Sequence, residues 1–68
     1  MCLSTVYRNE MKPENVAMQN VMRIECDGDM VLLTDLLERQ TAIHGTLLMA
    51  NLVDGFAVVR EAEPGVQN

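Results

Sequence analysis

The segment Gln19–Thr34, with the sequence QNVMRIECDGDMVLLT, decides the fold. In its first part, Gln19–Asp27, apolar and polar residues alternate with the period of a half-buried β-strand. Asp27-Gly28-Asp29 is a tight-turn sequence, and the apolar run Met30–Thr34 follows it directly. This order predicts a β-hairpin.

The alternation in the first strand also predicts which side chains are buried. It places Met22, Ile24 and Cys26 together on one face. A free cysteine is among the most frequently buried residue types and packs like a small apolar side chain. We therefore expect Cys26 to lie in the core.

The residues after the hairpin allow more than one interpretation. Asp35 and Glu38 have the spacing of a capping box, which predicts a short helical turn, although the same segment also fits a polar loop. A longer helix over Val31–Gln40 is the main competing prediction, because short apolar runs fit helices and strands equally well.

Turn residues divide the rest of the chain into further short strands. Before the hairpin, the sequence predicts a strand at Cys2–Arg8 and a polar loop at Asn9–Asn15. After it, a short strand is expected at Thr41–His44, ended by Gly45. A second hairpin follows, in which Asp54-Gly55 joins a strand at Thr46–Val53 to a strand at Phe56–Glu61. Repeated short strands of this kind are typical of a small barrel or sandwich. The expected fold is all-β, a barrel-like domain of about five to seven strands. It spans residues 1–62 and is followed by a mobile tail at residues 63–68.

The composition limits both the core and the partners. A chain of 68 residues buries only about 60% of the surface that its unfolded form exposes. Domains this small often need a disulfide, a metal or a partner subunit for stability. With one Tyr, one Phe and six Met, the core is expected to consist of Val, Leu, Ile and Met. The net charge of −5 argues against nucleic acid and favours cations or basic proteins as partners.

The cellular compartment is expected to be the cytoplasm. The segment Met1–Arg8 has no apolar stretch typical of a signal peptide, and no apolar run approaches the roughly 20 residues of a membrane helix. In a reducing compartment the two cysteines are expected to be free thiols, and a Cys2–Cys26 disulfide is a minor alternative.

Cys2 is the residue with the most distinctive chemistry. If Met1 is removed, the α-amine and the thiolate of Cys2 can close a five-membered chelate ring. If Met1 is retained, its amine, the Cys2 amide nitrogen and the thiolate can close two fused rings. Nitrogen donors in tetragonal or square-planar geometry point to Ni(II) or Cu(II). One chain offers few ligands, but a twofold dimer would present Cys2 twice. The alternative is that Cys2 is a small buried residue at the start of an edge strand.

The other polar residues carry weaker signals. His44 is the single histidine and is a possible, weaker ligand beside Cys2, because imidazole suits nickel, zinc and copper. It also fits an ordinary structural role. We expect the turn and tail carboxylates to be solvated; these are Asp27, Asp29, Asp35, Glu38, Asp54, Glu61 and Glu63.

The opening sequence Met1–Tyr7, MCLSTVY, resembles the start of the CooT family of small nickel-binding accessory proteins of carbon monoxide dehydrogenase maturation. Three further stretches fit the family: Val16-x-Met18-x-x-Val21-x-x-Ile24-Glu25, Gly28-x-x-Val31-x-Leu33-Thr34-Asp35-Leu36, and Gly45-x-Leu47 leading to Leu52. The resemblance implies a small β-barrel, a homodimer and Ni(II) bound through Cys2. It also implies delivery of nickel to a client enzyme. The tail has no histidine, so nickel storage of the kind seen in His-tailed members is not expected.

Two other functions remain open from the sequence. The HypC-type hydrogenase chaperones also begin with Met-Cys and are similar small barrels. A metal-independent interaction module of this kind would use methionines as contact residues, and the candidates are Met18, Met22, Met30 and Met49. A thiol enzyme would need Cys2 beside a positive group that lowers its pKa. We expect binding rather than catalysis, because a thin barrel leaves little room for a substrate pocket.

Overall fold

The computed structural model describes residues 3–62, which form five β-strands and one short 3-10 helix. The elements are β1 (Ser4–Arg8), η1 (Pro13–Asn15), β2 (Val16–Asp27), β3 (Met30–Asp35), β4 (Gln40–Asn51) and β5 (Phe56–Glu61). The all-β prediction is confirmed, with strand number at the lower end of the expected range. The predicted tail at residues 63–68 lies outside the described residues.

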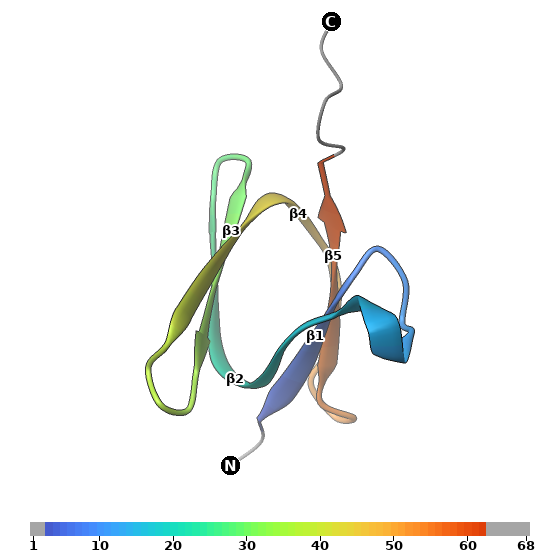
Figure 1. Ribbon diagram of the computed structural model, residues 1–68, viewed down its shortest axis with the longest axis vertical. Helices are drawn as coiled ribbons and strands as arrows, with labels where there is room; N and C mark the ends of the chain where they lie inside the picture. Colours follow the sequence, from blue (N-terminus) through green and yellow to red (C-terminus); the bar gives the residue numbers. More distant parts are fainter. Residues whose placement is uncertain (1–2, 63–68) are drawn as a thin grey trace, which may run out of the picture.

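The five strands form one closed barrel in the order β1-β2-β3-β4-β5 (Figure 1). Neighbouring strands are antiparallel except at the closure, where β1 and β5 run parallel with Thr5 opposite Phe56 and Arg8 opposite Val59. The two longest strands, β2 and β4, each pair with a different neighbour in each half. Closure leaves fewer open strand edges, as expected for so small a sheet.

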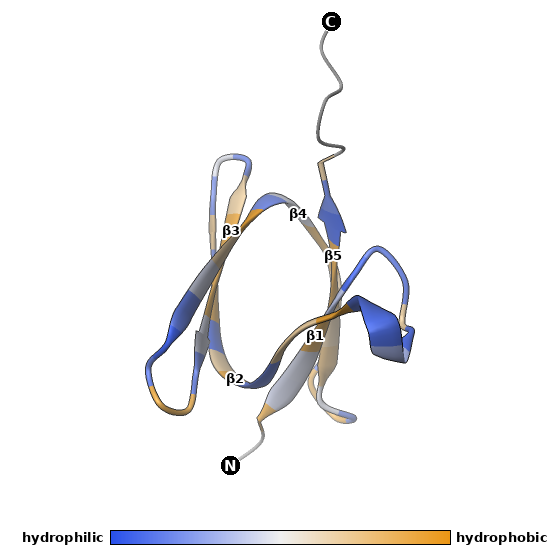
Figure 2. Cartoon of the chain, in the orientation of Figure 1, coloured by the Kyte–Doolittle hydropathy of each residue, from blue (hydrophilic) through white to orange (hydrophobic). Residues whose placement is uncertain are grey.

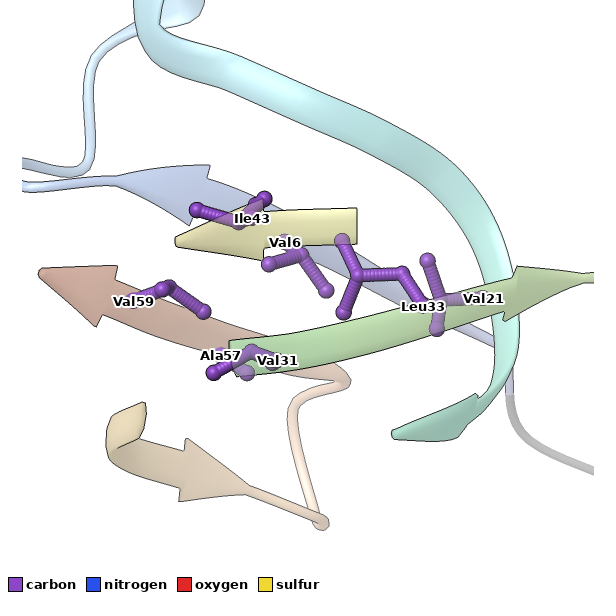
Figure 3. Packing of buried hydrophobic residues seen from close by; sticks show 7 residues of the cluster. All are labelled: Val6, Val21, Val31, Leu33, Ile43, Ala57 and Val59. Atoms are coloured by element: carbon purple, nitrogen blue, oxygen red, sulfur yellow. The ribbon is translucent and has the colours of Figure 1, made fainter. Parts of the chain in front are cut away.

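Short aliphatic side chains from all five strands fill the ring (Figure 3). The buried cluster consists of Val6, Val21, Val31, Leu33, Ile43, Ala57 and Val59, each at most 3% exposed. Val, Leu and Ile make up most of the core as expected, but the expectation that methionines share in it is wrong: no methionine among residues 3–62 is fully buried, and Met18 only packs against the cluster. A narrow ring favours compact β-branched residues, whose side chains have few rotamers to lose.

An irregularity in β2 changes the predicted burial pattern. The register with β3 shifts between Val21 and Arg23, so that Val21 is 3% exposed while Met22 is 44% exposed. A bulge of this kind interrupts the two-residue alternation. Ile24 still packs against the core, but the prediction of a buried Cys26 is wrong. Cys26 is exposed and lies one residue before the last pair of the hairpin, although its partner Val31 is buried.

The β2–β3 hairpin forms as predicted. Asp27 pairs with Met30, which leaves Gly28 and Asp29 as the two turn residues. Gly28 has φ 61°, a conformation that glycine adopts without strain. The alternative helix over Val31–Gln40 does not form, because Met30–Asp35 is paired with strands on both sides.

The turn between β3 and β4 is organised by a buried carboxylate. Asp35 is 3% exposed, so the expectation that it is solvated is wrong. Its Oδ1 accepts hydrogen bonds from the Leu37 and Arg39 amides at 2.9 Å, and its Oδ2 accepts one from Arg39 Nε at 2.8 Å. Burial opposes ionisation, but the Arg39 hydrogen bonds and positive charge outweigh it, and the pKa of Asp35 lies below its usual value.

This arrangement predicts an acid-sensitive stability. The pKa of Asp35 is about 3.9 in the unfolded chain and lower in the folded protein. Ionised Asp35 therefore stabilises the fold at pH values above about 3.9, and this contribution to stability is lost as the pH falls through the pKa of the folded state. Asp35→Asn is expected to lower the melting temperature at neutral pH by roughly 5–10 °C. It should also flatten the dependence of the melting temperature on pH between about 5 and 3. Thermal unfolding measured over this pH range checks both predictions. The control is Glu38→Gln, which removes an exposed carboxylate from the same turn. Parallel curves for wild type and Asp35→Asn would contradict this role.

Gly45 does not end a strand, contrary to the prediction. Strand β4 runs through it from Gln40 to Asn51. At this point β4 changes its partner: His44 pairs with Met30 of β3, whereas Gly45 pairs with Glu61 of β5. A Cβ atom at Gly45 would overlap the carbonyl oxygen of Arg60. Glycine is required here because two backbones touch.

The second predicted hairpin forms, with β5 at the predicted residues Phe56–Glu61, but its first strand ends at Asn51 and not at Val53. Asn51 pairs with Phe56, and four residues form the turn. Asn51 Oδ1 accepts hydrogen bonds from the Val53 and Asp54 amides at 3.1 and 2.9 Å. Gly55, with φ 81°, closes the turn.

Candidate metal site at the amino-terminal end of the ring

The described chain starts at the end of the ring that holds the β4–β5 turn (Figure 1). The Thr5 amide donates a hydrogen bond to the Gly55 carbonyl at 3.0 Å. The Leu3 carbonyl oxygen lies 3.3 Å from the position that a Cβ atom of Gly55 would occupy. Leu3 is half-buried. The chain therefore enters β1 against this turn and at the surface of the ring.

Apolar side chains surround this entry point. Ser4 borders a shallow groove of about 290 Å³ between β2 and β4, and its lining includes Met22, Ile24, Leu47 and Leu52. In the adjoining turn, the side chains of Leu52 and Val53 are 77% and 91% exposed. Exposed apolar side chains that gather at one end of a small domain are typical of a contact surface.

The predicted ligands Met1 and Cys2 themselves lie outside the described residues. Leu3, which follows Cys2 in the sequence, is the first residue that the structure describes. The nickel-site prediction for Met1 and Cys2 stays a prediction.

The structure does not bring His44, the weaker candidate ligand, to this end of the chain. The Ala62 amide donates to the His44 carbonyl at 2.8 Å, at the far end of β5 from Gly55. A six-residue strand such as β5 spans about 17 Å. Within one chain, His44 and Leu3 therefore lie at opposite ends of the ring.

His44 instead contacts Asp29 in the β2–β3 turn. The His44 Nε2–Asp29 Oδ2 distance is 2.7 Å, and both side chains are exposed, at 62% and 78%. The hydrogen bond from His44, followed by its positive charge, lowers the pKa of Asp29. The sequence showed Asp29 only as a turn residue. Their contact requires the β3–β4 register, which places His44 opposite Met30.

The remaining thiol and carboxylates do not gather into a second centre. Cys26 lies five residues along β2 from Val21, the partner of Ser4, which is about 16 Å in an extended strand. Among residues 3–62, no group of three or more His, Cys, Asp or Glu side chains is arranged to hold a metal ion. Most of the other carboxylates are exposed as expected, and Glu61 pairs with Arg8 at 3.5 Å.

The fold and this end of the ring define a small all-β domain with a compact aliphatic core. Exposed apolar side chains, which include Met22, Leu52 and Val53, form an apolar rim at its amino-terminal end. The model of the family described as CO dehydrogenase accessory protein CooT matches residues 1–60. The chain therefore belongs to the CooT family, and the resemblance of its sequence to that family is confirmed. A search of curated protein sequences gave no match. In the described part of the chain, no helix has the length and apolar character needed to cross a membrane.

Proposed function

We propose that this protein is a nickel(II)-binding accessory protein that helps to mature a nickel enzyme such as carbon monoxide dehydrogenase. The family match over residues 1–60 is the observation that carries the proposal, because the family is one of CO dehydrogenase accessory proteins. Nickel is the cargo, and the protein is a cytoplasmic carrier rather than an enzyme.

In this proposal Cys2 is the principal ligand. Its thiolate and the nitrogens of Met1 and Cys2 form a chelate from one short piece of backbone, and such mixed sulfur and nitrogen donors suit a tetragonal Ni(II) ion. The position of Leu3 supports the proposal, since this residue leads into β1 at the surface of the ring, beside the exposed β4–β5 turn. Donors at such a place remain accessible to a client that receives the metal.

The site is shared between two chains of a homodimer. A twofold contact through the apolar side chains at this end, such as Met22, Leu52 and Val53, which are all exposed, would place two chain starts near the axis. Two Cys2 thiolates with their neighbouring nitrogens would then complete the coordination of one ion. Burial of this apolar rim would supply the association free energy.

The proposal predicts a metal-to-protein stoichiometry. Native mass spectrometry of the full chain with added Ni(II) is expected to give one nickel ion per two chains. Binding should weaken as the pH falls, because the donor atoms must lose their protons before they bind. A dimer that forms without taking up nickel would instead support the metal-independent interaction module. One nickel ion on a monomer would contradict the shared site.

A further inference from the structure

The outer face of strands β2, β3 and β4 carries a second surface, at some distance from the start of the chain. Val31, Leu33 and Ile43 point into the core, so the alternate residues of these strands face outward. The register sets Glu25, Leu32 and Ala42 in one row across the sheet, and Asp27, Met30 and His44 in the next. The outer face is therefore apolar along β3 and carries carboxylates along β2.

Side chains of these rows form a shallow apolar hollow. Its volume is about 290 Å³, and its lining consists of Glu25, Asp27, Met30, Leu32 and Ala42. Met30 and Leu32 are half-buried and Ala42 is exposed. The thioether of Met30 adapts readily to the shape of a partner.

The carboxylates beside the hollow are largely available to a partner. Glu25 contacts Arg23 at 3.8 Å, with both side chains more than half exposed. Among residues 3–62, Asp27 has no ion-pair partner within 4.0 Å. Asp29, at the tip of the same hairpin, adds a third exposed carboxylate whose contact is His44. Figure 2 shows hydrophilic colouring in the turn between β2 and β3 and hydrophobic colouring where β3 begins.

We infer that this face, the outer surface of Glu25, Asp27, Met30, Leu32 and Ala42, docks a basic amphipathic helix of a partner protein. Charge complementarity selects the occupant: the hollow accepts apolar side chains, and the carboxylates of β2 accept Lys or Arg. A second copy of this acidic chain, with net charge −5, would set carboxylates against carboxylates at this face. The inference is independent of nickel and goes beyond the proposed function.

The spacing of the residues fits a helix. Alternate residues on one strand face, such as Glu25 and Asp27, or Met30 and Leu32, lie about 6.6–6.8 Å apart. Residues i and i+4 of a helix rise by about 6 Å. A helix that lies along β3 can therefore place leucines at i and i+4 over the hollow while two lysines at the same spacing face Glu25 and Asp27.

A peptide titration of the isotope-labelled full chain, followed by NMR at low ionic strength, tests the inference. The probe is a synthetic helical peptide of about 15 residues with a leucine stripe and lysines along one flank. Shifts are expected at residues 25–32 and 42–44. In Glu25→Gln/Asp27→Ser, the dissociation constant should rise about five- to tenfold, since each exposed ion pair contributes modestly.

Matched controls separate docking from general attraction to an acidic protein. Glu14→Gln/Glu38→Gln removes the same two charges from exposed positions outside the face, and its affinity should stay within about twofold of wild type. A second peptide with glutamine in place of lysine should bind at least about fivefold more weakly. Equal weakening in both double variants, equal binding of both peptides, or shifts centred on Leu36-Leu37 or Leu52-Val53 would overturn the inference. Concentration-dependent shifts at this face without peptide would overturn it too, by identifying a second copy as the occupant.

Discussion

Replacement of Cys2 by alanine is expected to weaken nickel binding by more than about 100-fold, because changes outside the direct ligands of metal sites already reduce affinity by about 10- to 100-fold. The substitution removes the soft donor and leaves only nitrogens at the chain start. Isothermal titration with Ni(II) measures the affinity, and the absorption band of thiolate-to-nickel charge transfer reports the sulfur directly. Both signals should disappear together.

Cys26→Ala is the matched control for this experiment. It removes the exposed thiol of the β2–β3 hairpin, so its nickel affinity and absorption band should equal those of the wild type. His44→Ala is a second control, because His44 lies at the opposite end of the ring from Leu3. A thiolate band that survives in Cys2→Ala and is lost in Cys26→Ala would transfer the site to the hairpin and refute the proposed function.

The largest expected effect on stability comes from Gly45→Ala. The added Cβ would overlap the Arg60 carbonyl oxygen and approach the Arg60 carbonyl carbon and the Glu61 Cα atom at 3.0 Å. All three belong to the backbone of β5, so no side-chain rotation relieves the overlap. The two strands must separate at the place where β4 changes partner. We expect a loss of about 3 kcal/mol in the free energy of unfolding, a large part of the stability of a domain of this size.

Gly28→Ala separates this steric effect from the conformational freedom of glycine. Gly28 has φ 61°, but a Cβ atom there would meet nothing within 4 Å. Its replacement should cost only about 1 kcal/mol, which is the strain of a left-handed alanine. Chemical denaturation of the two variants measures the difference. A Gly45→Ala protein as stable as Gly28→Ala would show that the two backbones are not in tight contact.

The hairpins and the fold class were predictable from the sequence because they depend on local chemistry. The turn at Asp27-Gly28-Asp29 forms as expected, and Asp54-Gly55 lies in a turn that begins two residues earlier than predicted, at Leu52. Such turns can be predicted because turn residues act over a few neighbouring positions. The alternation in β2 and the Asp54-Gly55 signal before β5 identified strands for the same reason. The CooT resemblance depended on a specific opening, Met1-Cys2, together with these local features.

Most of the errors arose where segments distant in sequence meet, whereas the error at Asp35 arose within a single turn. Gly45 resembles a strand terminator in sequence, and its real role depends on Arg60, which is 15 residues away. The bulge in β2 buries Val21 and leaves Met22 exposed, the reverse of the predicted burial. The alternation of apolar and polar residues in the sequence cannot show such a shift in register. Asp35 looked like a solvated turn residue because its buried state depends on three hydrogen bonds that only the folded turn supplies.

The parallel pairing of β1 with β5 bears on how the protein folds during synthesis. Asn9 accepts a hydrogen bond from the Glu61 amide across 52 residues of sequence, so the ring joins an early segment of the chain to a late one. A nascent chain on the ribosome cannot close this ring until β5 has left the exit tunnel. Until then Val6 cannot pack against Ala57 and Val59 of β5, and the edge of β1 that pairs with β5 stays open to other chains. Contacts between such distant residues also slow folding, which lengthens the time during which the edge of β1 is exposed.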